Sequence, residues 1–356
     1  MSITRLARPE IQSLQAYEAA EQVDDTIRLN ANESPRRCSI GNFRRPLNRY
    51  PEVRPQKLQR ALAKRFGCEP EQLLVTRGSS EGIDLVIRTF CRAVQDSVLM
   101  TSPSFSMYRH YAEVQGANLI EVPTNAEQDF AIDVDAILEA CDNTTKVIFV
   151  CSPNNPTGTT LSRAELERLL QKRGDNSAIV VDEAYVEFGD KTSVIELLDR
   201  YDNLLVLRTL SKALGFAGAR CGAVVGRAEV VSILSAVQAP YALATPVVEC
   251  VEDALQDDQL KLARETVREI VSERERLATT FSEYNFISRV WPSDANFLLV
   301  RVEDPALIMK RCAEQNVLLR DLDGELKNCI RISIGSREEN DLLLRALDTL
   351  EGAADG

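Results

Sequence analysis

The amino-acid sequence predicts an α/β fold, with a large domain built on a mostly parallel seven-stranded sheet and a smaller α+β domain after it. Two observations indicate this. Between about residues 70 and 226, short β-branched runs alternate with amphipathic segments, which is typical of parallel strands joined by crossover helices. After about residue 285 the pattern changes to short strands around two helical stretches. A chain of 356 residues is long enough to bury a core in each domain.

The expected strands of the large domain are short, and several are continuous apolar runs, as strands buried on both faces should be. They span residues 73–76, 97–101, 119–122, 146–151, 178–182, 204–208 and 223–225. Ser162 and Glu165 form a capping box at the start of a helix that continues to about Gln171. A further helix is expected over residues 133–141.

The remaining segments suggest how the chain is divided. Apolar residues recur at helical spacing between residues 257 and 284, so one long helix is expected to link the two domains. The first 50 residues are rich in proline and are expected to form an irregular arm that contacts the small domain and a neighbouring subunit. The predicted parts are an arm (1–50), a large domain (51–256), a linking helix (257–284) and a small domain (285–356). Within the small domain, strands are expected over 296–302, 317–320 and 329–334, and helices over 305–315 and 338–350.

Composition excludes several classes of protein. A net charge of −12 argues against a nucleic-acid partner, and no apolar run approaches the roughly 18 residues needed to span a membrane. The single histidine, His110, is expected to be structural, and sites that need two or three histidines are excluded. Nine cysteines without a C-x-x-C pair indicate reduced thiols, and the amino terminus lacks the apolar region of a secretory signal. We therefore expect a cytoplasmic protein without a bound metal.

Polar residues that follow the predicted strands carry the chemical information. Lys212 follows the strand at 204–208, with Thr209 and Ser211 before it and Arg220 after it. This arrangement is typical of an imine-forming lysine beside a phosphate-binding cup, and it points to pyridoxal phosphate. A nearby arginine should also lower the pKa of the Lys212 amine. Most lysines are solvated surface residues, however, so this feature needs support from the other strand ends.

Three other strand ends offer ring-binding groups. A pyridoxal cofactor needs an acidic partner for its ring nitrogen, and Asp182 lies at the carboxyl end of an apolar strand, where ligands of open α/β sheets bind. Tyr185 and Asn155 could donate to the phenolic oxygen of the ring, and Phe105 could stack on its face. The plainer alternatives are a helix cap for Asp182, turn formation for Asn155 and core packing for Phe105.

The predicted phosphate cup has two parts. Ser79 and Ser80 follow a strand and precede a helix over residues 81–90, so backbone N–H groups and the helix dipole can hold an anion there. A plain helix cap explains these two serines about as well. Hydroxyls and a countercharge would come from Thr209, Ser211 and Arg220.

Taken together, these motifs resemble a known family. The motifs Asn154 to Gly158, Asp182 to Tyr185, Ser211-Lys212 and Arg220 resemble fold-type I aminotransferases of the aspartate aminotransferase superfamily. Four further motifs resemble the histidinol-phosphate aminotransferases, in a match that runs from about residue 5 to 350. They are Leu29 to Pro35, Asn48 to Pro51, Leu319 to Asp321 and Ile330 to Gly335.

The resemblance implies a homodimeric enzyme that exchanges an amino group between L-histidinol phosphate and 2-oxoglutarate, giving imidazole acetol phosphate and L-glutamate in histidine biosynthesis. It implies that Lys212 forms the Schiff base with pyridoxal 5′-phosphate, that Asp182 binds the ring nitrogen, and that Asn155 and Tyr185 bind the phenolic oxygen. The implied phosphate ligands are Ser79, Ser80, Thr209, Ser211, Arg220 and, from the other subunit, Tyr50. The implied substrate-binding residues are Arg320 and Arg331, assisted by Tyr17, and Asn155.

Two positions depart from the family pattern. Phe105 stands where many relatives have tyrosine, and Ser80 stands where some have aspartate. Neither change removes a group that the chemistry requires.

Other functions remain as alternatives. An aromatic amino-acid aminotransferase or a threonine-phosphate decarboxylase would share the cofactor residues, so only Arg320, Arg331 and Tyr17 discriminate between them. A non-catalytic, cofactor-binding regulator would need a DNA-binding module, for which no basic segment is evident. A hydrolase or dehydrogenase is disfavoured because neither G-x-S-x-G nor G-x-G-x-x-G occurs.

Overall fold

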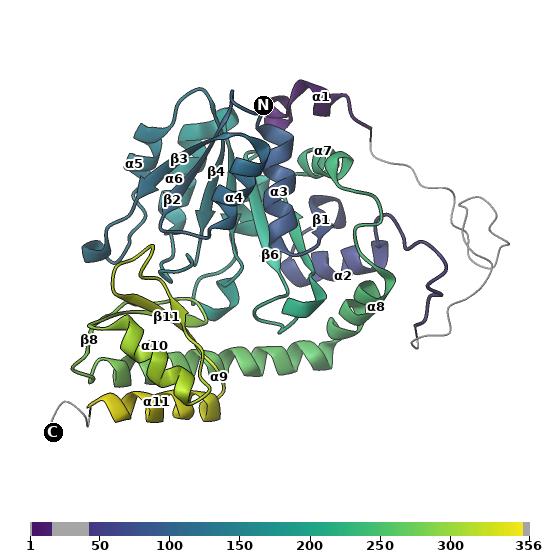
Figure 1. The fold of residues 1–356 in the computed structure, drawn as a ribbon. Helices are drawn as coiled ribbons and strands as arrows, with labels where there is room; N and C mark the ends of the chain where they lie inside the picture. Colours follow the sequence, from purple (N-terminus) through teal and green to yellow (C-terminus); the bar gives the residue numbers. More distant parts are fainter. Residues whose placement is uncertain (1, 16–42, 352–356) are drawn as a thin grey trace.

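The computed structural model describes residues 2–15 and 43–351, and it contains two β-sheets (Figure 1). The large sheet has seven strands in the order β1-β7-β6-β5-β4-β2-β3. Only β7 runs antiparallel to its neighbours, β1 and β6. The strands are β1 Leu73–Thr76, β2 Ser97–Ser102, β3 Asn118–Pro123, β4 Thr145–Cys151, β5 Ala178–Asp182, β6 Leu204–Thr209 and β7 Gly222–Val225. The predicted mostly parallel seven-stranded sheet is therefore confirmed, and each predicted strand is correct to within one residue at either end.

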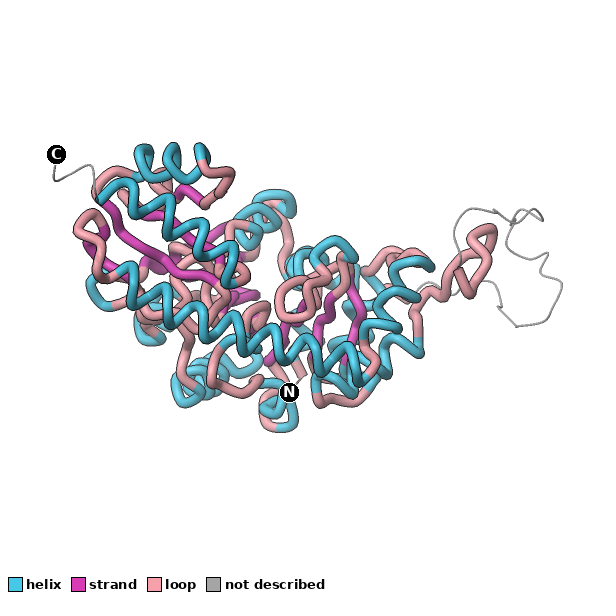
Figure 2. The backbone as a smooth tube through the Cα atoms, turned by 90° about the horizontal axis from the view of Figure 1, so that it is seen from below, coloured by secondary structure: helices cyan, strands magenta, loops and turns pink. Residues whose placement is uncertain are grey.

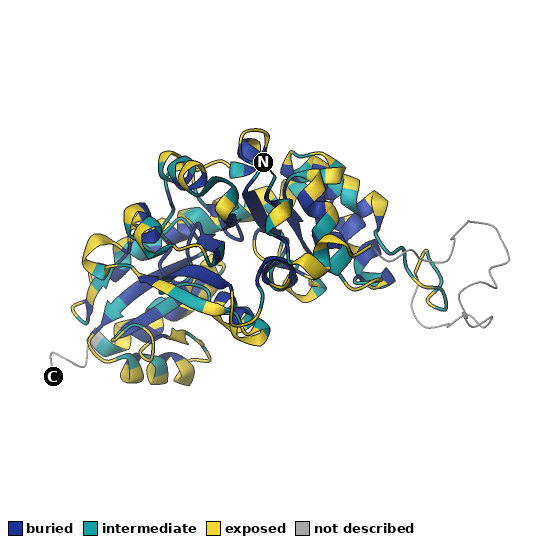
Figure 3. Ribbon diagram, turned by 90° about the horizontal axis from the view of Figure 1, so that it is seen from above, coloured by how far each residue is buried: buried dark blue, intermediate teal, exposed yellow. Residues whose placement is uncertain are grey.

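Helices cover both faces of this sheet, because successive side chains of each strand point to opposite sides. In β4, for example, Ile148 and Val150 pack in one core while Val147 and Phe149 pack in the other. Figure 3 shows the buried strands between helices whose outer surfaces are exposed. One face carries α3 Ser79–Phe90, α4 Met107–Gln115 and α7 Ala228–Val237. The other carries α2 Gln56–Phe66, α5 Val134–Ala140, α6 Arg163–Arg173 and α8 Thr245–Ala254.

The second sheet is small and antiparallel, in the order β10-β11-β9-β8. Its strands are β8 Ile287–Val290, β9 Phe297–Val302, β10 Arg320–Asp321 and β11 Cys329–Ser333, and its helices are α10 Pro305–Glu314 and α11 Arg337–Glu351. Near the amino terminus, the short α1 spans Pro9–Gln12. None of the helices in the described part of the chain combines the length and apolar character needed to cross a membrane.

The helix α9, Asp257–Phe281, joins the two sheets and runs along the molecule (Figure 2). Its buried Arg274 donates hydrogen bonds to the carbonyl oxygens of Phe188 and Ala295, at 3.0 and 2.8 Å. Phe188 follows β5, and Ala295 precedes β9, so one side chain ties the large sheet to the small one. Tyr185 reinforces this junction, because its ring packs edge-on against Phe297 at 5.3 Å.

For the small sheet, one predicted strand is wrong and one observed strand was missed. A strand was expected over residues 317–320, but β10 contains only Arg320 and Asp321. The chain instead leaves α10 through a turn, in which Asn316 has φ of 58° and Val317 donates to the Cys312 carbonyl oxygen. The strand β8 was not predicted. The helix α9 also ends at Phe281, three residues before its expected end.

Candidate active site

A cavity of about 410 Å³ lies at the carboxyl ends of the large-sheet strands, facing the small sheet. Its lining includes every predicted site residue among the described ones except Tyr50. These residues are Ser79, Ser80, Phe105, Asn155, Asp182, Tyr185, Thr209, Ser211, Lys212, Arg220, Arg320 and Arg331. The described lining also includes residues that were not predicted as site residues: Ser104, Ser106, Cys151, Pro156, Ala184, Ala217, Leu322 and Glu325. Of all these lining residues, four are basic and two, Asp182 and Glu325, are acidic.

Lys212 is the amine of this cavity. It follows β6, its side chain is open to the cavity, and its Nζ lies 5.5 Å from the centre of the Tyr185 ring. Burial lowers the pKa of the Lys212 amine, and the positive charges of Arg331 and Arg220 lower it further, against a smaller opposing effect of Asp182. The predicted direction of the pKa is therefore right, but burial contributes more than the neighbouring arginine. A larger share of neutral amine favours attack on a carbonyl or imine carbon.

Asp182 is the buried carboxylate of the cavity, with only 2% of its surface exposed. Its Oδ2 accepts a hydrogen bond from the Tyr108 hydroxyl at 2.8 Å, and its Oδ1 accepts the Ala184 N–H at 3.1 Å. Burial raises the pKa of Asp182 to about 6, although these two donors and Lys212 lower it in part. Tyr108 was not predicted as a site residue. Its role depends on how α4 packs against the sheet, which the sequence does not reveal.

The adjacent Glu183 holds the end of β5 in place. Its carboxylate pairs with the buried Arg208 of β6 at 3.0 Å and accepts hydrogen bonds from the Ser193 hydroxyl and the Val194 N–H. Because β5 and β6 are neighbouring parallel strands, this pair fixes the strand end that carries Asp182 relative to the one that leads to Lys212.

A cluster of hydroxyls and one guanidinium lies at the amino-terminal end of α3. The Thr209 hydroxyl is 3.0 Å from that of Ser211, and Arg220 Nη1 is 3.4 Å from the same Ser211 oxygen. Gly78 precedes α3 with φ of 76°, and a Cβ there would lie 2.8 Å from Arg220 Nη2. Free N–H groups of a helix start, hydroxyls and an arginine together match the ligands that proteins use for phosphate.

Glycine at position 222 lets this cluster form. Gly222 pairs with Thr76 of β1 on one side and with Thr209 of β6 on the other. A Cβ at Gly222 would lie 2.6 Å from the Arg208 carbonyl oxygen and 2.9 Å from the Gly78 carbonyl carbon. The two strand ends that lead to the cluster can approach this closely only because residue 222 has no side chain.

Two arginines from the small sheet complete the cavity. Arg320 and Arg331 are directly opposite each other on β10 and β11. Like charges in this position destabilise a sheet unless an anion lies between them. Arg331 also donates to the Asn155 side-chain oxygen, and its Nε is buried without a hydrogen-bond partner. Burial lowers the pKa of Arg331, and the charge of Arg320 lowers it further. The pair is therefore suited to bind an oxyanion.

Two described residues that the sequence analysis discussed, Tyr50 and His110, do not line this cavity. Tyr50 is 51% exposed, stacks on Tyr241 at 4.7 Å and does not line the cavity of its own chain. The prediction that Tyr50 acts in a partner subunit stays a prediction. Tyr17 lies outside the described residues. His110 is exposed on α4 and does not line the cavity.

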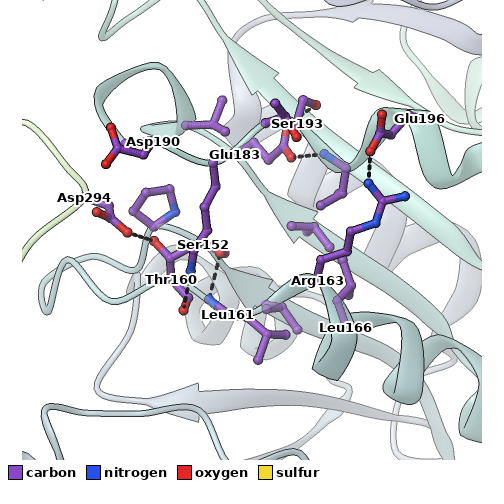
Figure 4. Close-up of a pocket in the computed structure, with 18 residues that line it drawn as sticks. Ser152, Thr160, Leu161, Arg163, Leu166, Glu183, Asp190, Ser193, Glu196 and Asp294 are labelled. Carbon is purple, nitrogen blue, oxygen red and sulfur yellow. Dashed lines mark hydrogen bonds and ion pairs between the residues drawn. The ribbon is translucent and has the colours of Figure 1, made fainter.

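A second cavity, of about 300 Å³, lies beside the Glu183 strand end (Figure 4). Its polar groups bind one another, since Thr160 donates to Asp294 at 2.6 Å and Ser193 donates to Glu183 at the same distance. Its lining contains none of the residues that the sequence analysis predicted as site residues. We therefore assign the candidate active site to the larger cavity.

Comparison with known proteins identifies the class to which this site belongs. Residues 19–347 match the family described as aminotransferase class I and II, so the chain belongs to that family and is a transaminase. Histidinol-phosphate aminotransferase 1 of Haemophilus influenzae is 40% identical over 351 residues, which cover 98% of this chain and 95% of that protein. Within the class, the chain therefore belongs to the histidinol-phosphate aminotransferases.

Solved structures show the same fold. Histidinol-phosphate aminotransferase from Sinorhizobium meliloti, in complex with pyridoxal-5′-phosphate, has a TM-score of 0.76 and 23% identity, over 85% of this chain and 84% of that one. L-threonine-O-3-phosphate decarboxylase from Porphyromonas gingivalis has a TM-score of 0.72 and 25% identity, over 85% and 91%.

Proposed function

We propose that this protein exchanges the amino group of L-histidinol phosphate with 2-oxoglutarate, giving imidazole acetol phosphate and L-glutamate, in histidine biosynthesis. The full-length similarity to a histidinol-phosphate aminotransferase supports the substrates. The observation that carries the proposal is the cavity itself. It combines one amine, one buried carboxylate, a phosphate-suited cluster and a second arginine pair for the substrate.

The residues present fit pyridoxal 5′-phosphate as the cofactor. When bound, this group supplies a protonated ring that withdraws electrons from the substrate carbon. Lys212 would hold the cofactor through a Schiff base, Asp182 would pair with the ring nitrogen, and Phe105 would cover the ring face. Asn155 and Tyr185 would bind the phenolic oxygen. The phosphate would be bound by Ser79, Ser80, Thr209, Ser211 and Arg220.

Lys212 is also the group that would move the proton. The free Nζ lies in the cavity with a lowered pKa, so with substrate bound it would be placed to accept the proton from the substrate carbon. The only histidine of the chain, His110, does not line the cavity. We therefore infer that the lysine both holds the cofactor and acts as the acid and base of a ping-pong transamination.

The arginine pair would accept both substrates in turn. Histidinol phosphate carries a phosphate, whereas glutamate carries carboxylates, and a guanidinium forms paired, charge-assisted hydrogen bonds with either group. Arg331 donates to Asn155, so an incoming oxyanion would compete for a donor that is already oriented towards the cavity.

The remaining expectations belong to this proposal. We propose a homodimer in which Tyr50 reaches the cofactor phosphate of the partner subunit and Tyr17 assists substrate binding. The exposure of Tyr50, which lies in the segment preceding α2, is compatible with this arrangement. A role in amino-acid biosynthesis is compatible with a cytoplasmic location.

The principal alternative is decarboxylation of threonine phosphate, because a decarboxylase with that substrate shares the fold at 25% identity. Its substrate also carries a phosphate, so the arginine pair alone does not distinguish the two reactions. The higher identity to an aminotransferase favours transamination.

Single half-reactions test the proposal. The purified holoenzyme, without an acceptor keto acid, would be mixed in turn with L-histidinol phosphate, L-glutamate, L-phenylalanine and L-threonine O-3-phosphate. We expect the visible absorbance of the Schiff base to disappear with histidinol phosphate and glutamate, and more slowly with phenylalanine. Release of CO₂ from threonine phosphate, or conversion of phenylalanine but not of histidinol phosphate, would overturn the proposal.

A further inference from the structure

Tyr108 is a buried residue that the proposed function does not use. It is the second residue of α4, is fully buried and does not line the cavity. Its hydroxyl nevertheless donates to Oδ2 of Asp182 at 2.8 Å. Burial and the negative charge of Asp182 raise the pKa of Tyr108 well above its usual value. The phenol therefore stays protonated at neutral pH, where it can donate to the Asp182 carboxylate.

The Tyr108 ring is fixed by two other aromatic residues. It stacks on Phe149 of β4, with ring centres 4.5 Å apart and an interplanar angle of 9°. Its edge meets Phe105, which lines the cavity, at 5.7 Å and 88°. A ring held from both sides cannot move its hydroxyl away from Asp182 without disturbing the residue proposed to cover the cofactor face.

Few other groups act on the Asp182 carboxylate. Oδ1 accepts the backbone N–H of Ala184, and Lys212 contributes an opposite charge from the loop after β6. Cys151, at the end of β4, also faces this carboxylate, and burial raises the pKa of its thiol to about 12, so it is uncharged. The negative charge of the adjacent Glu183 raises the pKa of Asp182, although the Glu183 carboxylate is itself paired with Arg208. Among the described groups, Tyr108 is thus the side-chain hydroxyl that binds Asp182.

We propose that Tyr108 is a positioning residue for the cofactor ring: its hydroxyl orients the Asp182 carboxylate, and its ring supports Phe105. The inference rests on the cofactor site proposed above. In this proposal, one buried tyrosine positions two groups that would contact the cofactor ring: Asp182, which would pair with the ring nitrogen, and Phe105, which would cover the ring face.

Removal of the hydroxyl should have a specific effect. Asp182 would lose a donor that stabilises its charged form, so it would hold a proton more tightly and leave less positive charge on the ring nitrogen. A less positive ring withdraws electron density less strongly, so the imine nitrogen at Lys212 becomes more basic. The pKa of this Schiff base should rise by about one unit, as expected for the loss of one hydrogen bond to a charged group. The dissociation constant of the cofactor should rise about tenfold for the same reason.

The experiment compares Tyr108→Phe with Tyr201→Phe. Tyr201 is a matched control, because it is also buried and its hydroxyl donates to a carboxylate, Glu167, at 2.9 Å, but it does not line the cavity. For each full-length variant, the absorbance of the bound cofactor is titrated against pH, cofactor affinity is measured on the cofactor-free protein, and kcat and KM are determined. Tyr108→Phe should raise the pH midpoint of the cofactor absorbance and the dissociation constant of the cofactor. It should lower kcat and leave the KM for glutamate unchanged. Tyr201→Phe should match the wild type in all four quantities.

A second substitution keeps the test decisive if Tyr108→Phe does not fold. Fluorotyrosine incorporated at position 108 keeps the ring and the hydroxyl but makes the phenol a stronger donor, so the midpoint should fall. An unshifted midpoint in either folded variant, or an equal shift in Tyr201→Phe, would overturn the inference. A wild-type protein that binds no pyridoxal phosphate would instead overturn the proposed function.

Discussion

Arg331 donates a hydrogen bond to the side-chain oxygen of Asn155, a residue 176 positions earlier in the chain. Arg331 belongs to the small sheet, and Asn155 follows β4 of the large sheet. The contact closes the cavity across the junction of the two sheets. It also links the proposed substrate-binding arginine to a residue proposed to bind the cofactor, so substrate binding and cofactor orientation share one pair of side chains.

Replacement of Arg331 tests whether it binds both substrates. Arg331→Lys keeps the charge but removes the planar fork, so the KM values for glutamate and for histidinol phosphate should both rise by about tenfold or more. Arg289→Lys is the control, because Arg289 pairs with Glu127 and Asp129 on the surface. Steady-state kinetics with each substrate provide the measurement. A rise for only one substrate would show that Arg331 does not bind the other.

Replacement of Lys212 tests its two proposed roles together. Lys212→Ala should abolish steady-state turnover and the absorbance of the Schiff base, while the phosphate cluster still holds the cofactor non-covalently. Lys191→Ala, at a lysine of the second cavity, should leave both unchanged. Substantial turnover by Lys212→Ala would contradict the assignment. Absorbance spectra and an assay of glutamate formation measure the two effects.

Asp182 should make the stability of the cofactor-free protein depend on pH. Burial raises the pKa of Asp182 to about 6, above the value of about 3.9 for an unfolded chain, so the folded protein binds the proton more tightly. Below about pH 4, Asp182 is protonated in both the folded and the unfolded protein and does not change the stability. Between about pH 4 and pH 6 the unfolded chain loses this proton first, so the free energy of unfolding falls by about 3 kcal/mol in total. Above pH 6 the effect of Asp182 is constant.

Urea unfolding between pH 4.5 and 7.5 measures this effect. Asp182→Asn removes the titration, so the stability of this variant relative to the wild type should increase up to about pH 6 and then remain level. Asp199→Asn, at a carboxylate that is 88% exposed, controls for the change in net charge. A difference between Asp182→Asn and wild type that did not vary with pH would show that Asp182 has no raised pKa.

Gly222→Ala should disrupt the phosphate cluster. The added methyl group would collide with the backbone at Arg208 and Gly78, which cannot move without separating the strands, and overpacking of this kind costs about 1–3 kcal/mol. Cofactor affinity should fall as well, because Gly78 precedes the helix that contributes to the cluster. Gly218→Ala is the control, since a Cβ there meets nothing within 4 Å. Thermal unfolding and cofactor titration measure the two effects. Equal stability and equal cofactor affinity of the two variants would show that the close contact of Gly222 with Arg208 and Gly78 is unimportant.

The large sheet was predictable because its strands are buried on both faces, and short, continuous apolar runs such as that of β5 are typical of such strands. The order of the strands was not predictable, since nothing in residues 222–225 indicates that β7 lies antiparallel between β1 and β6. The local apolar pattern also led to a wrong strand prediction at residues 317–319. Leu318 is 87% exposed, because Asn316 turns the chain out of α10.

Most of the site was predictable because its residues follow strands that end at one edge of the sheet. Lys212, Asp182 and Asn155 could be placed together from their strand positions alone. Tyr108 could not, since it lies in a helix beside Arg109 and His110, where a tyrosine is usually a surface residue. Only the packing of α4 against β4 turns its hydroxyl towards Asp182.

The charges of the cavity differ in sign from those of the whole molecule. Four basic residues and two acidic ones line it in the described chain, whereas the protein as a whole carries a net charge of −12. An approaching phosphate or dicarboxylate is therefore repelled by the distant field and attracted only within about one Debye length of the entrance, ~8 Å at physiological ionic strength. Moderate salt weakens the long-range repulsion between the substrate and the acidic protein surface more than it weakens the short-range attraction between the substrate and the arginines of the cavity. Substrate association with this enzyme should thus tolerate salt better than association with a uniformly basic surface.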